Sequence, residues 1–174
     1  MMSELHILSV LFRLANEYEL TEPFMKTRIE SITTACEGFR ELQSESMAMG
    51  FNMLRRLEEN WLNRTNCFDK PGEKLSGFFV DGLLIGVCGL NQDPYLSSVR
   101  AGRLRHLYVG REWRRKQIGM TLLQTVLEDC ERCFDFISTN APQSAFAFYE
   151  RAGFTPLNDV EKVTHRLYLE HKQR

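Results

Sequence analysis

Residues 114–123, RRKQIGMTLL, are the stretch that decides the fold of this chain. A basic loop leads to Gly119 and then to an apolar run with helical spacing, and the strand-like segment 104–109 comes just before it. A helix N-terminus presents unsatisfied N–H groups and the positive end of the helix dipole, so a loop entering a helix here could hold a diphosphate. An ordinary solvated loop before a helix fits the same pattern equally well.

The segments downstream of this stretch alternate between helix and strand patterns. Apolar spacing predicts a helix over 119–132, a strand over 134–139, a helix over 143–151 ended by Gly153, and a strand over 163–169. Strand, helix and strand in this order indicate a mixed α/β unit at the centre of the chain.

Upstream, a hairpin is the clearest prediction. Asp81-Gly82 separates the apolar runs 77–80 and 83–90, and a type I′ turn needs positive φ at both central positions, which favours this pair. A loop over 91–102 then leads to the strand at 104–109. The rest of the N-terminal half predicts a helix over 3–19, a short strand over 27–33, and two amphipathic helices over 34–63 that meet near Gly50.

Length and charge exclude several classes of protein. A chain of 174 residues suits one compact domain. Its net charge of -1 argues against sequence-independent nucleic-acid binding, and the basic run 111–116 lacks interleaved aromatic residues. The apolar stretch 7–14 is too short to span a membrane and has no cleavage site after it. Five scattered cysteines favour a reducing cytoplasm.

Two segments together resemble the GNAT acetyltransferase superfamily. Residues 114–123 resemble its signature of Arg or Gln, two variable residues, Gly, a variable residue and Gly or Ala before an apolar helix. Residues 145–154, AFAFYERAGF, are similar to the closing signature of that family, in which an aromatic-Tyr pair precedes Gly-Phe. The resemblance covers 77–169 well, and over 27–61 it is only architectural.

This resemblance implies a fold and a domain organisation. The expected fold class is α/β (α+β), a mixed and mostly antiparallel sheet flanked by helices, with splayed central strands that form an acetyl-CoA cleft. Residues 1–24 are then an N-terminal helical extension, and 25–174 are the acetyltransferase domain. Because the pattern from Met25 onward suffices for that domain, a chain beginning there is expected to fold and bind the cofactor.

The resemblance also assigns cofactor-binding positions. It implies that backbone groups of Leu107 and Val109 bind the pantetheine arm, and that an N–H near Tyr108 polarises the acetyl carbonyl. The diphosphate loop and helix start would comprise Arg114, Arg115, Lys116, Gln117, Ile118, Gly119 and Met120. Gln117 stands where relatives usually have glycine and should fit if its φ stays negative. Pro142 replaces a frequent asparagine, which leaves Asn140 as the nearby candidate.

Tyr149 is the candidate catalytic acid for the departing thiolate, with a core aromatic as its alternative role. The general base is not assigned. Some relatives have a glutamate where this chain has Arg103, which cannot serve as a base. The remaining candidates, Glu45, Asp93, His106 and His165, are each more typical of solvated or structural positions, and a water chain is equally consistent.

The predicted function is acetyl-CoA-dependent transfer of an acetyl group to a primary amine of a small molecule, amino acid or peptide. A non-catalytic acyl-CoA sensor is the first alternative, because of Gln117 and the unassigned base. An interaction domain that assembles through 3–61, for example as a homodimer, is the second. Cys130 and Cys133 have metal-pair spacing but no second pair at a suitable distance, so no metal is expected.

Overall fold

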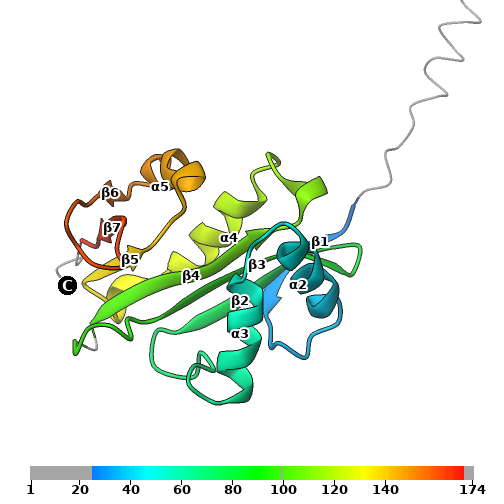
Figure 1. The fold of residues 1–174 in the computed structure, drawn as a ribbon, viewed down its shortest axis with the longest axis horizontal. Helices are drawn as coiled ribbons and strands as arrows, with labels where there is room; N and C mark the ends of the chain where they lie inside the picture. The colour runs from blue at the N-terminus through cyan, green and yellow to red at the C-terminus, as the bar shows by residue number, and fades with distance from the viewer. Residues whose placement is uncertain (1–24, 99, 171–174) are drawn as a thin grey trace, which may run out of the picture.

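The computed structural model describes residues 25–170 except 99, and they form one sheet with helices on both faces (Figure 1). The strands are β1 (Thr27–Ser31), β2 (Lys74–Val80), β3 (Leu83–Gln92), β4 (Ala101–Val109), β5 (Phe136–Thr139), β6 (Thr155–Pro156) and β7 (His165–Tyr168). The helices are α2 (Phe39–Ala48), α3 (Met53–Leu62), α4 (Ile118–Leu127) and α5 (Phe146–Arg151).

The sheet has the strand order β1-β2-β3-β4-β5-β7-β6. Every neighbouring pair is antiparallel except β4 and β5, which run parallel on either side of helix α4 in the chain. A parallel pair needs such a crossover, because a tight turn cannot join strands that point the same way. The predicted mixed and mostly antiparallel sheet is therefore confirmed.

The β2–β3 hairpin forms where Asp81-Gly82 predicts it. Asp81 has φ 48° and Gly82 has φ 85°, so both central residues take the left-handed conformation that a type I′ turn requires. The Asp81 carboxylate accepts a hydrogen bond from the Lys26 N–H at 2.9 Å, which ties the start of β1 to this turn.

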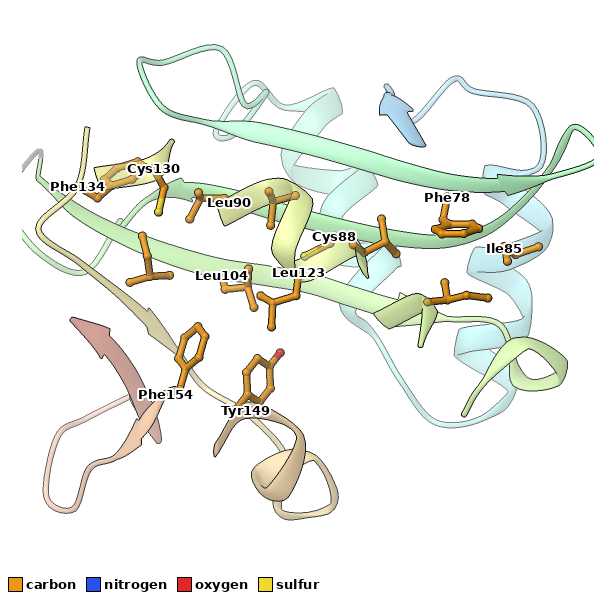
Figure 2. Close-up of a cluster of buried hydrophobic side chains, with 14 of the residues drawn as sticks. Phe78, Ile85, Cys88, Leu90, Leu104, Leu123, Cys130, Phe134, Tyr149 and Phe154 are labelled. Carbon is orange, nitrogen blue, oxygen red and sulfur yellow. The ribbon is translucent and has the colours of Figure 1, made fainter. Parts of the chain in front are cut away.

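Two apolar clusters cover the two faces of the sheet. One lies under α4 and α5 and includes Leu90, Leu104, Leu123 and Phe154 (Figure 2). The other lies under α2 and α3 and is built around residues such as Phe39 and Leu57. Because both faces are covered, strand β3 is buried along almost its whole length.

Some boundaries differ from the predicted ones. Helix α4 ends at Leu127 rather than 132, because Glu128 leaves the helical conformation and Asp129 has φ 59°; a separate 3₁₀ turn, Cys130–Arg132, follows. The predicted loop over 91–102 is shorter, since Gln92 already pairs with Gly102. Strand β6, only two residues long, had no recognisable pattern.

Two predictions extend beyond the described residues. The helix over 3–19 lies outside them, and so does the N-terminal extension to which it was assigned. The sufficiency of the chain from Met25 stays a prediction. Among the helices of the part that the structure describes, none is both long and apolar enough to cross a membrane.

Candidate functional site

The central parallel strands separate along their length. Strands β4 and β5 pair only from Ala101↔Phe136 to Arg103↔Ser138. Within the described residues, the rest of β4 has no strand partner on this side, and the Thr139 hydroxyl donates to the Leu104 carbonyl at 3.4 Å where the gap begins. An unpaired strand edge offers backbone N–H and C=O groups to an extended ligand, so the gap can receive one as an added strand would be received.

A bulge in β4 sets the orientation of the residues beside this gap. Val87 pairs with Tyr108 and Gly89 with Arg105, so β4 holds one residue more than β3 between these pairs, and His106 has φ 59°. Beyond the bulge, Leu107 and Val109 pack with the α4–α5 cluster, while Tyr108 belongs to the α2–α3 cluster. A bulge bends its strand locally and re-aims side chains, and here it helps to part β4 from β5.

A cleft of about 640 Å³ lies along the unpaired part of β4. Its lining includes most of the predicted site residues, namely Leu107, Tyr108, Val109, Arg114, Arg115, Gln117, Ile118, Gly119, Met120 and Tyr149. Lys116 and Asn140 do not line it. The Lys116 ammonium lies 5.0 Å from the centre of the Trp113 ring, and Asn140 is exposed beyond the end of β5.

The remaining lining residues were missed by the sequence predictions. Phe51 and Met53 come from the junction of α2 and α3, which is distant in the sequence, so no local pattern indicated them. Ser144, Phe148 and Arg151 belong to the segment around α5 and follow one another at spacings of four and three residues, so the helix predicted over 143–151 could have indicated that they share a face. The others are Trp113, Pro142 and Ala145.

The charged residues of the cleft all have the same sign. Arg114, Arg115 and Arg151 line it, and among the residues that the structure describes, no aspartate, glutamate or histidine does so. A cleft lined by one sign of charge concentrates ligands of the opposite sign. This arrangement suits a polyanionic ligand, such as one that carries a diphosphate.

The loop before α4 contains two left-handed residues. Arg115 has φ 60° and Gln117, at the N-cap of α4, has φ 64°. The expectation that Gln117 keeps a negative φ was therefore wrong. The position takes the conformation that a glycine would adopt most easily, and the glutamine side chain is accommodated at the cost of backbone strain.

The Arg114 side chain lines the cleft but is held against the end of β4. Its Nε donates to the Val109 carbonyl at 3.0 Å, and its guanidinium lies 5.3 Å from the centre of the Tyr108 ring. One of the backbone groups predicted to bind the pantetheine arm is thus already satisfied within the protein.

Tyr149 lies on α5 with its ring in the apolar cluster and its hydroxyl directed towards Leu123 (Figure 2). Phe148 and Phe154 contact it edge to face, with ring centres 5.1 and 5.4 Å away. Burial raises the pKa of Tyr149, and the neighbouring Cys88 thiol adds to the rise. The phenol therefore keeps its proton at neutral pH while lining the cleft, so the core and catalytic roles are compatible.

Among the four base candidates, Glu45 is hydrogen-bonded to the side chain of the cleft residue Tyr108. Its Oε1 accepts hydrogen bonds from the Tyr108 hydroxyl at 2.7 Å and from the Arg111 N–H at 2.8 Å. Burial and this carboxylate raise the pKa of Tyr108 to about 12, so Tyr108 remains a donor. Glu45 thereby ties helix α2 to β4 and to the loop before α4.

The other base candidates have structural roles. His106 is buried beside the Met53 carbonyl, 2.8 Å from its Nδ1, and burial lowers the pKa of His106 to about 3, which makes it a poor base. Asp93 pairs with the buried Arg103, with 3.1 Å between Oδ1 and Nε. His165 is fully buried against the Phe146 ring.

The cysteine pair shows no metal-site geometry beyond its spacing. Cys130 is buried, and burial raises the pKa of its thiol to about 11. Within residues 25–98 and 100–170, no group of three or more histidine, cysteine, aspartate or glutamate side chains is placed to hold a metal ion.

A mostly antiparallel sheet that opens between two central parallel strands, beside a basic loop at a helix N-terminus, defines a class of acyl-group transferases. The family model described as "Acetyltransferase (GNAT) domain" matches residues 38–169. The chain belongs to this family of acetyltransferases.

Solved structures agree with this assignment. A protein from Exiguobacterium sp. 255-15, provisionally described as an acetyltransferase, has a TM-score of 0.74 and 25% identity, covering 83% of this chain and 94% of its own. The ribosomal-protein-alanine N-acetyltransferase of Brucella melitensis has a TM-score of 0.61 and 17% identity, and the match covers 82% of this chain and 99% of that protein. The glucosamine-6-phosphate N-acetyltransferase of Arabidopsis thaliana has a TM-score of 0.56 and 15% identity, and the match covers 76% of this chain and 94% of that protein.

The latter two identities are low enough that the likeness concerns the fold. Their names show that one fold serves acceptors as different as a protein alanine and an amino sugar phosphate. A search of curated protein sequences finds no match to this chain.

Proposed function

We propose that this protein transfers the acetyl group of acetyl-CoA to a primary amine of a small molecule, amino acid or peptide. The observation that carries the proposal is the unpaired edge of β4 along a cleft whose charged residues are all arginines. The family membership supports acetyl transfer in general, and the charge of the cleft supports a ligand with several phosphates.

The residues of the cleft fit acetyl-CoA if Arg114 moves. The backbone of 107–109 would hold the pantetheine arm, and 114–120 the diphosphate. Because Arg114 donates to the Val109 carbonyl in its present position, its withdrawal would free that carbonyl and release a guanidinium for the phosphates. At Gly119, an added Cβ would lie 3.6 Å from Phe148 and 3.7 Å from Val109, so a larger side chain there would fill the cleft.

The chemistry requires an activated acetyl group, a proton for the leaving thiolate and an uncharged amine. Acetyl-CoA would supply the acetyl group as a thioester. Tyr149 would hold the proton for the thiolate, since its burial keeps the phenol protonated. In the described part of the chain, no carboxylate or imidazole lines the cleft, which favours loss of the amine proton to water. The three arginines would favour the uncharged form of the amine.

Calorimetric titration with acetyl-CoA tests the binding half of the proposal. We expect saturable binding by the wild type, loss of binding in Gly119→Asp, and about a tenfold weaker affinity in Arg114→Ala, as removal of a charge-assisted contact would give. Arg132→Ala removes an exposed arginine that does not line the cleft, and this variant should bind as the wild type does. Absence of saturable binding by a folded wild type would refute the proposal.

Thiol release with a panel of amines tests the catalytic half. We expect Tyr149→Phe to keep its affinity for acetyl-CoA. Its kcat should fall by about tenfold or more, whereas a general acid typically contributes about 100-fold to 10⁴-fold. A wild type that binds acetyl-CoA but releases no thiol with any amine would instead support the sensor alternative.

A further inference from the structure

A second cavity, of about 530 Å³, lies away from the acetyl-CoA cleft and shares no lining residue with it. It is formed where the loop after α3 meets the end of β3 and the β3–β4 loop, which lie on the same side of the sheet in Figure 1. Its polar and charged lining residues include Asn66, Lys70, Glu73, Asn91, Asp93 and Arg105. Its volume is in the range of small-molecule sites.

Arg105 is the central residue of this cavity. Its side chain is partly buried, and among the residues that the structure describes its guanidinium has neither a hydrogen-bond nor an ion-pair partner. Burial lowers the pKa of Arg105, with Tyr95 and Asp93 acting in the opposite direction and Arg103 and Arg56 adding to the fall. Removing water from a guanidinium without giving it a partner costs folding free energy, and a bound anion would offset this cost.

Both acidic residues of the cavity already accept hydrogen bonds from the protein. Glu73 accepts from the Gln92 N–H at 2.9 Å and, with its other oxygen, from the Lys70 N–H at 3.0 Å. Asp93 accepts through Oδ1 from Arg103 and from the Tyr95 N–H at 3.0 Å. The Lys70 ammonium, by contrast, has no partner in the described part of the chain. Because Arg103 neutralises Asp93, the two cations Lys70 and Arg105 stand against the single carboxylate of Glu73, and the net charge of the cavity is positive.

Buried polar atoms without partners gather at the same place. Across the described residues, four buried side-chain nitrogen or oxygen atoms lack a hydrogen bond, and three of them belong to Asn66, Asn91 and Asp93. Asn91 and Asp93 are 4% and 3% exposed. Native proteins rarely leave such atoms unsatisfied, and a polar ligand or ordered water accounts for many of the exceptions. A cluster of them around an unpaired arginine marks a built polar site.

We propose that this cavity binds a small molecule that carries a carboxylate or phosphate, with the oxyanion held by Arg105 and Lys70. The fork of the guanidinium matches either oxyanion with two parallel hydrogen bonds. Hydroxyl or N–H groups elsewhere on the ligand satisfy the free acceptor oxygens of Asn91 and Asp93. The proposal does not rest on the proposed acetyl transfer, because the two cavities have no lining residue in common.

Two-dimensional NMR of the full ¹⁵N-labelled chain tests the site, with succinate and inorganic phosphate as separate probes. The Arg105 Nε–Hε signal is identified by its absence from the spectrum of Arg105→Gln. We expect this signal to shift saturably as each probe is added. The probe that binds more tightly shows which oxyanion the site prefers. Arg105→Gln should weaken binding about tenfold or more and Lys70→Gln several-fold. The Gly119 N–H signal reports separately on anions that enter the acetyl-CoA cleft.

Arg56→Gln is the matched control. It removes a positive charge close enough to affect Arg105, but Arg56 is exposed on α3 and does not line the cavity. If Arg56→Gln weakened the affinity for the probes as much as Arg105→Gln does, the effect would come from general electrostatics, and the proposal would be overturned. The absence of saturation by tens of millimolar of either probe would overturn it as well. If Arg105→Gln fails to fold, loss of affinity in Lys70→Gln, an exposed position, decides the question.

Discussion

Three residues with side chains adopt positive φ along the cleft: His106, Arg115 and Gln117. Each such residue costs about 1–2 kcal/mol relative to ordinary backbone, so their presence here indicates that tertiary contacts impose the conformation. His106 forms the bulge of β4, and the other two shape the loop before α4. The departure of Gln117 from the family pattern is thus a change of side chain with the glycine-like backbone retained.

Gln117→Gly should therefore stabilise the protein. Relief of the strain, about 1–2 kcal/mol, outweighs the entropy of an added glycine, about 0.5–1 kcal/mol. We expect the free energy of unfolding to rise by about 0.5–1 kcal/mol, seen as a Tm increase of about 1–4 °C in calorimetry.

Gln124→Gly is the control for this prediction. Gln124 is exposed in the interior of α4, where the same substitution should cost about 1 kcal/mol. A Gln117→Gly protein that loses stability as Gln124→Gly does would show that the left-handed conformation carries no strain.

At the scale of elements, Glu45 connects α2 to β4 and to the loop before α4. One carboxylate oxygen receives both the Tyr108 hydroxyl and the Arg111 N–H. Hydrogen bonds to charged groups contribute about 1.5–3 kcal/mol when buried, and less here because Glu45 is partly exposed. We expect Glu45→Ala to lower the free energy of unfolding in urea by about 1–2 kcal/mol.

Glu41→Ala, on the same helix, provides the comparison. Glu41 is exposed in the first turn of α2, and its loss should change stability by less than about 0.5 kcal/mol. Similar losses in the two variants would mean that the contacts of Glu45 contribute nothing beyond helix propensity.

Elements with a strong local signal were predictable, and those without one were not. The Asp81-Gly82 turn fixes the β2–β3 hairpin because few residue pairs accept positive φ twice. The end of α4 was missed because no glycine or proline marks it, and Asp129 takes the left-handed conformation instead. Strand β6 was not predicted, because two residues are too few to show an alternating pattern and their pairing with β7 depends on the rest of the sheet.

At the scale of the whole molecule, Arg103 joins segments that are far apart in the sequence. Besides its buried ion pair with Asp93, its Nη1 donates to the Lys162 carbonyl at 2.9 Å. The Tyr95 ring lies 4.7 Å from the Arg103 guanidinium and 4.5 Å from the Lys162 ammonium. Strand β4, the β3–β4 loop and the segment before β7 are thereby held together.

Asp93→Ala should be strongly destabilising, because it leaves the buried Arg103 charge without its partner. We expect a loss of about 3–5 kcal/mol in the free energy of unfolding, measured in urea. Glu161→Ala, which removes an exposed ion pair in the neighbouring loop, should cost no more than about 1 kcal/mol. If the two variants unfolded at the same urea concentration, the Arg103 network would not be holding these segments.

The sequence by itself determined the mixed sheet, the central strand-loop-helix unit and most of the positions around the cleft. The strand-loop-helix unit follows from local spacing, whereas the cleft positions follow from the resemblance of 114–123 and 145–154 to the signatures of the acetyltransferase family. Only the tertiary structure decided that Phe51 and Met53 join them, that Arg103 is neutralised, and that Arg105 is not. Contacts between distant segments depend on strand register and on how the sheet closes, and no local pattern records either.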